Sequence, residues 1–131
     1  MRFVRSLVLL AVLLAAAGCV EVNNNYLEAK DFADYLRRDG IPVESVRELP
    51  PDPFRASSAV AIMVEGSEIG VYKYDRSADI QDRRIQKLAA SKRTFIAGIP
   101  YPIEVSGSFM ILGLDKNKRK RDILKTLKNF R

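Results

Sequence analysis

The 131-residue chain contains no histidine, no tryptophan and only one cysteine. The absence of histidine excludes Ser-His-Asp and Cys-His catalysis, and any zinc site built on imidazole ligands. A single cysteine excludes an internal disulfide, a C-x-x-C redox pair and an iron–sulfur cluster held by this chain alone. No segment has the alternating oxygen ligands and central glycine of a calcium loop. We therefore expect no metal, no cofactor and no enzymatic activity.

The composition is that of one globular domain. Hydrophobic residues make up 47% of the chain and charged residues 29%, which excludes a disordered tract and a multi-span membrane protein. Lys and Arg number 22 against 16 Asp and Glu, for a formal net charge of +6.

The first eighteen residues have the pattern of a secretory signal peptide. Arg2 and Arg5 supply positive charge, and residues 7–17 form an uncharged run of Leu, Val and Ala. That run is shorter than the roughly 20 residues that a membrane-spanning helix needs. It ends in Ala15-Ala16-Ala17-Gly18-Cys19, which resembles the lipobox of bacterial lipoproteins. The alternatives are an ordinary secretory signal with a chance cysteine, and an uncleaved anchor.

The lipobox resemblance implies that the thiol of Cys19 receives diacylglycerol and that Cys19 becomes the new N-terminus after cleavage. The only cysteine of the chain stands at the position that lipidation requires. Val20 follows it in place of aspartate, which by resemblance to enterobacterial sorting favours the outer membrane if the host is Gram-negative. The implied location is the extracytoplasmic side of the cell envelope, anchored to a membrane. An envelope protein is then the expected partner, and nucleic acid is not.

Removal of residues 1–18 leaves a mature chain of 113 residues with 20 basic and 16 acidic side chains, a net charge of +4. Residues 19–25 read as a lipidated polar tether, and residues 26–131 as a single α+β domain. Its pattern predicts an antiparallel sheet of about five strands with three helices packed on one face. The expected elements are a helix at 26–39, a strand at 41–49, a hairpin of 59–64 and 69–74, a helix at 78–90, a short strand at 94–99 interrupted by Pro100-Tyr101-Pro102, a hairpin around Ser106-Gly107, and a helix beginning near 119.

This order of elements is similar to that of small uncharacterised bacterial lipoproteins. The matching segments are Val71-Tyr72-Lys73-Tyr74, Phe109 to Leu112 and Ile123-Leu124-Lys125-Thr126-Leu127. Because that group has no agreed activity, the resemblance implies the fold and not the function.

Basic residues are concentrated at the C-terminus. Residues 115–131 hold eight basic and two acidic side chains, whereas residues 19–114 have a net charge of −2. At about 100° per residue, Lys118, Arg121, Lys125 and Lys128 form a stripe opposite the apolar face of the last helix. Such a stripe can contact anionic lipid headgroups or an acidic envelope polymer, at up to ~1 kcal/mol per basic residue. The alternative, which we favour, is a solvated helix face whose cations complement the helix dipole.

Two further groups of side chains are candidate sites. Tyr72, Tyr74 and Tyr101 could line a ligand groove, although tyrosines more often cover the edge of a core. Paired carboxylates could serve as general acid and base, but this small chain without tryptophan lacks the usual aromatic platforms of a sugar cleft. The sequence thus predicts a membrane-anchored envelope lipoprotein with a non-catalytic binding or scaffolding domain, or alternatively a module that binds a small molecule on its tyrosine-bearing sheet face. The carboxylates in question are Glu65, Glu68, Asp75, Asp79 and Asp82.

Overall fold

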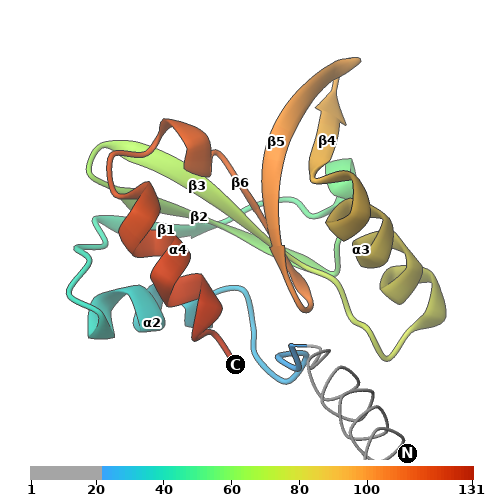
Figure 1. The fold of residues 1–131 in the computed structure, drawn as a ribbon, viewed down its shortest axis with the longest axis horizontal. Helices are drawn as coiled ribbons and strands as arrows, with labels where there is room; N and C mark the ends of the chain where they lie inside the picture. Colours follow the sequence, from blue (N-terminus) through green and yellow to red (C-terminus); the bar gives the residue numbers. More distant parts are fainter. Residues whose placement is uncertain (1–21) are drawn as a thin grey trace, which may run out of the picture.

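The computed structural model describes residues 22–131, which form a six-stranded antiparallel sheet and three α-helices (Figure 1). The strand order is β1-β2-β3-β6-β5-β4. The predicted α+β class is confirmed, with six strands where about five were expected. In chain order the elements are α2 (Asp31–Arg38), β1 (Ser45–Glu48), the 3-10 turn η1 (Asp52–Phe54), β2 (Ser58–Val64), β3 (Ser67–Lys73), α3 (Asp79–Ser91), β4 (Arg93–Ile96), β5 (Ile99–Ser106), β6 (Phe109–Leu112), the 3-10 turn η2 (Leu114–Lys116) and α4 (Lys120–Lys128).

Helices α2 and α4 cover one face of the sheet. Alternate residues of β2, β3 and β6 point to this face and pack against the apolar sides of both helices. Phe130 lies at the centre of this cluster. Its ring is 5.1 Å from that of Phe32, 4.8 Å from Tyr35 and 4.8 Å from Phe109, all edge to face. The last residues of the chain are therefore part of the core.

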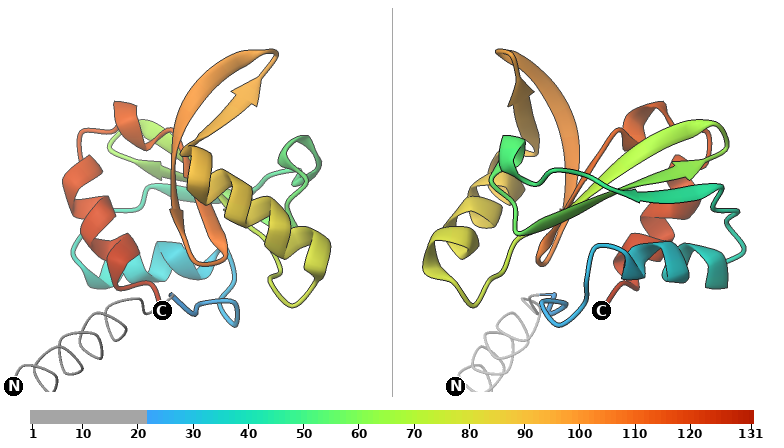
Figure 2. Two further views of the ribbon diagram at one scale, coloured as in Figure 1. Left: turned by 45° about the vertical axis from the view of Figure 1, so that its right-hand side comes forward. Right: turned by 180° about the vertical axis from the view of Figure 1, so that it is seen from behind.

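Helix α3 covers the opposite face, over β4, β5 and β6 (Figure 2). Its buried residue Ile85 packs in a second cluster that includes Met110 of β6. Met110 stands between Phe109 and Ile111, which both point to the first face. The expectation that all three helices share one face is therefore wrong. Residues on both sides of the central strands are apolar, and each side needs its own cover.

Two hairpins turn through a pair of residues with left-handed backbone. Glu65 and Gly66 have φ of 50° and 73° between β2 and β3, and Ala97 and Gly98 have φ of 50° and 79° between β4 and β5. Positive φ at both central residues is the geometry of the two-residue turn that matches the twist of the adjoining strands. The β2–β3 hairpin was predicted from the sequence, whereas the β4–β5 hairpin was not.

Strand β5 of the second hairpin contains Pro100 and Pro102, and the pairing with β4 explains why they do not interrupt it. Pro100 pairs with Phe95 and Pro102 with Arg93, and neither pair exchanges main-chain hydrogen bonds in an antiparallel ladder closed at Ile96 and Ile99. The missing N–H groups of proline are therefore not needed on the β4 side. The expectation that Pro100-Tyr101-Pro102 interrupts the strand is wrong for this reason.

The first helix begins five residues later than predicted. The chain turns at Asn24, whose carbonyl accepts the N–H of Leu27 at 3.0 Å, and α2 starts only at Asp31. Just before the helix, the N–H of Glu28 donates to the carboxylate of Asp31 at 2.7 Å.

Candidate functional site

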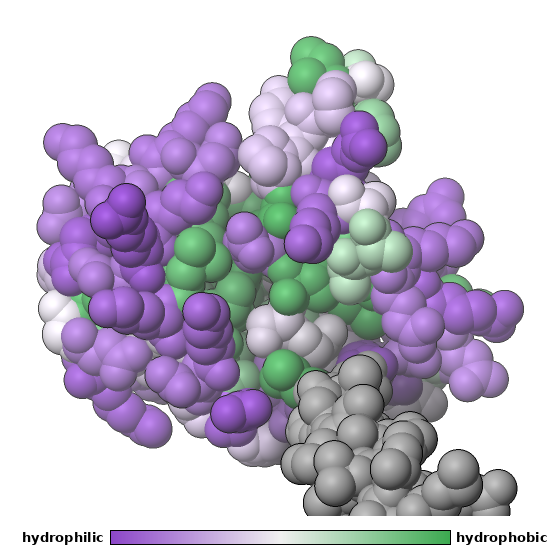
Figure 3. Space-filling model, viewed as in Figure 1, coloured by the Kyte–Doolittle hydropathy of each residue, from purple (hydrophilic) through white to green (hydrophobic). Residues whose placement is uncertain are grey.

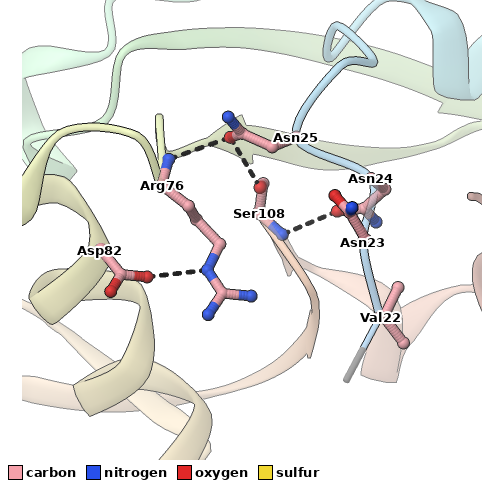
Figure 4. A pocket seen from close by; sticks show the side chains of 7 residues that line it. All are labelled: Val22, Asn23, Asn24, Asn25, Arg76, Asp82 and Ser108. Carbon is pink, nitrogen blue, oxygen red and sulfur yellow. Dashed lines mark hydrogen bonds and ion pairs between the residues drawn. The ribbon is translucent and has the colours of Figure 1, made fainter. Parts of the chain in front are cut away.

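A polar cavity of about 340 Å³ lies where the described chain begins (Figure 4). The cavity is open to solvent and lies between residues 22–25, the β5–β6 turn and the start of α3. The described chain enters the fold at this point. The residues that line it are Val22, Asn23, Asn24, Asn25, Arg76, Asp82 and Ser108.

Asn24 ties the beginning of the described chain to two distant segments. Its side chain is fully buried and accepts the N–H of Ser108 at 2.8 Å. Its amide nitrogen donates to the carbonyls of Ser106 at 3.1 Å and Phe130 at 3.0 Å. One side chain thereby satisfies three backbone groups from the β5–β6 turn and the end of α4. We call this arrangement the asparagine lock.

Asn25 continues the network toward α3. Its side-chain oxygen accepts the N–H of Arg76 at 2.9 Å and the hydroxyl of Ser108 at 2.9 Å, and its amide donates to Asp75 at 3.2 Å. Hydrogen bonds from Ser77 and then from Asn25 hold the pKa of Asp75 below its ordinary value. Arg76 in turn donates to Asp82 of α3 at 2.8 Å. The polar atoms thus bind one another, and the chemistry of the cavity is to position the residues before α2.

The packed body of the domain begins earlier in the chain than predicted. We expected residues 19–25 to form a polar tether and the domain to begin at residue 26. Asn24 and Asn25 are instead bound into the packed body, because their side chains replace the missing backbone partners of the β5–β6 turn. Cys19 lies outside the described residues.

The three tyrosines proposed as a ligand face do not form one. Tyr74 is fully buried and Tyr72 is 7% exposed, and Tyr101 alone is partly exposed, on β5. The hydroxyl of Tyr74 donates to the carbonyl of Phe54 at 2.6 Å, and the ring of Phe54 packs edge to face on Tyr72 at 4.8 Å. Burial raises the pKa of Tyr74 to about 12 and also raises that of Tyr72. These two rings belong to the core under α3 and the 3-10 turn η1.

The four residues of the predicted basic stripe, Lys118, Arg121, Lys125 and Lys128, are exposed. Among the described residues, no ion pair involves Lys118, Arg121, Lys125 or Lys128. Arg121, Lys125 and Lys128 lie on one side of α4, and Lys118 precedes the helix. Because the asparagine lock holds Phe130, the C-terminal end of α4 lies near the chain entry and Lys118 lies at the far end.

Four of the five carboxylates that could serve in catalysis are engaged with other groups. Glu68 forms a two-pronged contact with Arg47 at 2.7 and 3.0 Å, and Glu65 lies 3.4 Å from Arg119. Asp75 and Asp82 belong to the network around Asn25 and Arg76. Within residues 22–131, no three His, Cys, Asp or Glu side chains are grouped to hold a metal ion.

A shallow groove of about 700 Å³ runs beside strand β1. Its floor includes Val46, Leu49 and Val60, and its rim carries charges of both signs, with Lys30 paired to Glu28 at 3.2 Å. The mixed rim gives the groove no preference for a ligand of one charge.

Comparison of the chain with protein-family models, curated proteins and solved structures finds no match in any of the three. Within the described part, no helix combines the length and the apolarity that a bilayer crossing needs.

Sequence reasoning missed Asn24, Asn25 and Ser108 as a set. The bonds from Asn24 to Ser106, Ser108 and Phe130 span 82, 84 and 106 positions. No local pattern encodes such contacts. The available signal was the run of three asparagines itself, a residue type that readily satisfies backbone groups outside regular structure.

Proposed function

We propose that this chain is a lipid-anchored protein of the bacterial cell envelope, attached to the membrane through Cys19. Its domain acts by binding or scaffolding and not by catalysis. Support from the sequence is the leader of residues 1–18 and the placement of the single cysteine directly after it. An envelope protein and the membrane itself are the proposed partners.

The asparagine lock is the structural observation that carries the proposal further. Asn24 is fully buried and fixed by three hydrogen bonds, and it stands five residues after Cys19. A chain extends by at most about 3.6 Å per residue, so Cys19 lies within about 18 Å of the domain. An acyl anchor at Cys19 would hold the domain against the headgroups. This arrangement suits a protein that works at the membrane surface, not one that reaches across a wide compartment.

The internal chemistry of the domain supports binding over catalysis. Hydrogen bonds stabilise Asp75 as a carboxylate and hold its pKa below the ordinary value. A general acid at neutral pH needs the opposite, a carboxyl group whose pKa is raised. The polar groups that converge at the cavity are used to bind the chain itself.

Substitution of Cys19 tests the proposal directly. The wild-type protein in its host should incorporate an alkyne-tagged fatty acid and sediment with membranes, and Cys19→Ser should lose the label and keep its full precursor length. Val20→Asp provides a matched control next to the same site, because it should retain the label and move from the outer to the inner membrane of a Gram-negative host. A label that persists in Cys19→Ser would exclude the anchor.

A further inference from the structure

The hairpin of β4 and β5 projects from the body as an arm whose tip is apolar. We define the arm as residues 93–102. Phe95 is 60% exposed, Ile96 40% and Ile99 55%. Figure 1 shows the arm rising away from the rest of the sheet, and Figure 3 shows apolar residues gathered at its tip. Among the large apolar side chains of the described residues that are exposed, half belong to this one tip.

The tip is apolar on both of its faces. In the hairpin register, Phe95 pairs with Pro100 and Ile96 pairs with Ile99. Neighbouring pairs of a ladder point to opposite faces, so Phe95 and Pro100 occupy one side and Ile96 and Ile99 the other. A two-stranded ribbon with apolar residues on both sides gains little from packing on the body and exposes apolar area that soluble proteins normally bury.

The base of the arm is cationic. From Arg83 to Ile103 the chain has five basic residues and no carboxylate. Lys92 and Arg93 stand at the base, and both are exposed. On α3, Arg83 and Lys87 lie on the side opposite the buried Ile85, together with Ile80, which is 60% exposed. The apolar tip is thus followed by a surface of one charge sign along α3 from Arg83 onward, and the acidic residues Asp79 and Asp82 lie in the first turn at the other end of the helix. We call Lys87, Lys92 and Arg93 the basic collar.

We propose that the arm is a membrane-binding element, in which the tip enters the interface of an anionic bilayer and the basic collar binds lipid phosphates. A bilayer surrounds both faces of the tip without a preformed shape, whereas a protein would need a slot of matching width. The collar, without acidic neighbours along the chain, complements a negatively charged surface. The inference draws on the proposed function in one respect, because an anchor at Cys19 places a membrane within reach.

The place where the described chain begins determines whether an anchor at Cys19 and the arm tip can contact the same membrane. A side-chain carbon placed on Gly107 would lie 3.0 Å from the carbonyl of Val22, so the described chain begins beside the β5–β6 turn. The arm tip lies at the other end of β5, eight residues away, which is about 25 Å in a strand. Anchor and tip can therefore contact one membrane when β5 is inclined to its surface with the tip leading. Helix α4 is on the far side of β5 from α3 in Figure 1, so its basic stripe would not share that contact.

A single tryptophan tests the insertion, because the natural chain has none. We would introduce Phe95→Trp and measure its emission in vesicles of phosphatidylglycerol and phosphatidylethanolamine that contain acyl-brominated lipid. The expected result is a shift to shorter wavelength and strong quenching by bromine. Val46→Trp is the matched control, since Val46 is 37% exposed on β1 at the opposite edge of the sheet and should give neither effect. Equal behaviour of the two tryptophans would overturn the proposal.

Matched charge variants test the collar. Replacing Lys87, Lys92 and Arg93 with Gln should weaken binding of the leaderless chain, residues 20–131, to the same vesicles on the order of 100-fold at low salt. Replacing Arg121, Lys125 and Lys128 with Gln removes the same charge from α4 and should change binding much less. A larger loss from the α4 variant would overturn the proposal and favour the stripe predicted from the sequence.

Failure of the anchor and failure of the arm give different results. The leaderless chain contains the complete sheet and both apolar clusters and has no Cys19, so its vesicle binding is independent of the anchor. An unlipidated Cys19 together with quenched emission from the Phe95→Trp variant would contradict only the anchor. A lipidated Cys19 together with unquenched emission from that variant would contradict only the arm. Quenching that requires an added envelope protein would assign the arm to a protein partner and contradict the lipid proposal.

Discussion

The side-chain amide of Asn24 lies 3.0 Å from the carbonyl oxygen of Phe130, a residue 106 positions later in the chain. This bond joins the two ends of the described domain at the β5–β6 turn. Asn24→Ala would leave that carbonyl, the carbonyl of Ser106 and the N–H of Ser108 without their partner. We expect a loss of about 3 kcal/mol in the free energy of unfolding, measured in urea. Asn23→Ala, at the exposed neighbour, should change it by less than about 0.5 kcal/mol.

Gly107 and Asn24 should act as one unit. A side-chain carbon at Gly107 would overlap the oxygen of Asn24, and Gly107 has φ of 58°. We expect Gly107→Ala to destabilise the domain by displacing Asn24 as well as by backbone strain. In a double-mutant cycle, the Asn24→Ala/Gly107→Ala variant should therefore lose clearly less stability than the sum of the two single losses. Simple additivity would show that Gly107 matters only for its backbone.

Tyr74 should make the domain sensitive to alkali. Burial raises its pKa to about 12, above the ordinary value of 10, so the folded state holds the phenolic proton more tightly than the unfolded state. Its contribution to stability is complete below about pH 10 and is lost as the pH rises toward 12. Tyr74→Phe should flatten this decline in melting temperature, and Tyr26→Phe, at a ring that is 70% exposed, should leave it unchanged. An identical decline in both variants would assign the effect to other groups.

The β2–β3 turn offers a stabilising substitution. Glu65 has φ of 50°, a left-handed conformation that asparagine tolerates better than glutamate. We expect Glu65→Asn to raise the free energy of unfolding by about 0.5 kcal/mol, after the loss of an exposed ion pair with Arg119 that is worth little. Glu65→Val is the control at the same position and should lower it, since a β-branched residue is strained at positive φ. Equal stability of the two variants would mean that the turn backbone is not limiting.

Local patterns predicted the parts of the fold that local physics determines. The Glu65-Gly66 hairpin follows from turn chemistry, and the buried side of α4, with Ile123 and Leu127, follows from helical periodicity. Residues 59–64 of β2 are apolar without alternation, a pattern typical of a central strand covered on both sides. The same observation could have placed one helix on each face, because a strand covered twice needs two layers.

What the sequence could not show depends on distant contacts. Tyr72 and Tyr74 were predicted to share a face and do so, but only the tertiary structure shows that Phe54 and α3 cover it. Asn24 was predicted to lie in a tether because its hydrogen-bond partners at the β5–β6 turn are more than 80 positions away. The arm was not predicted because Pro100 and Pro102 suggested a break in the strand. A strand accepts proline only where the missing N–H is not needed for pairing, and this depends on which edge of β5 is paired.

Pro100 and Pro102 also limit the pairing of the arm with other strands. The N–H of Ile103 points to the β4 side, where it donates to Lys92, so the backbone of residues 100 and 102 faces the other edge, which β6 leaves unpaired beyond Ile103. An open edge of this kind normally invites another strand to add to the sheet. Proline at both positions leaves that edge without donors. Copies of this protein that meet at this edge can thus expose their apolar arms without adding a strand there.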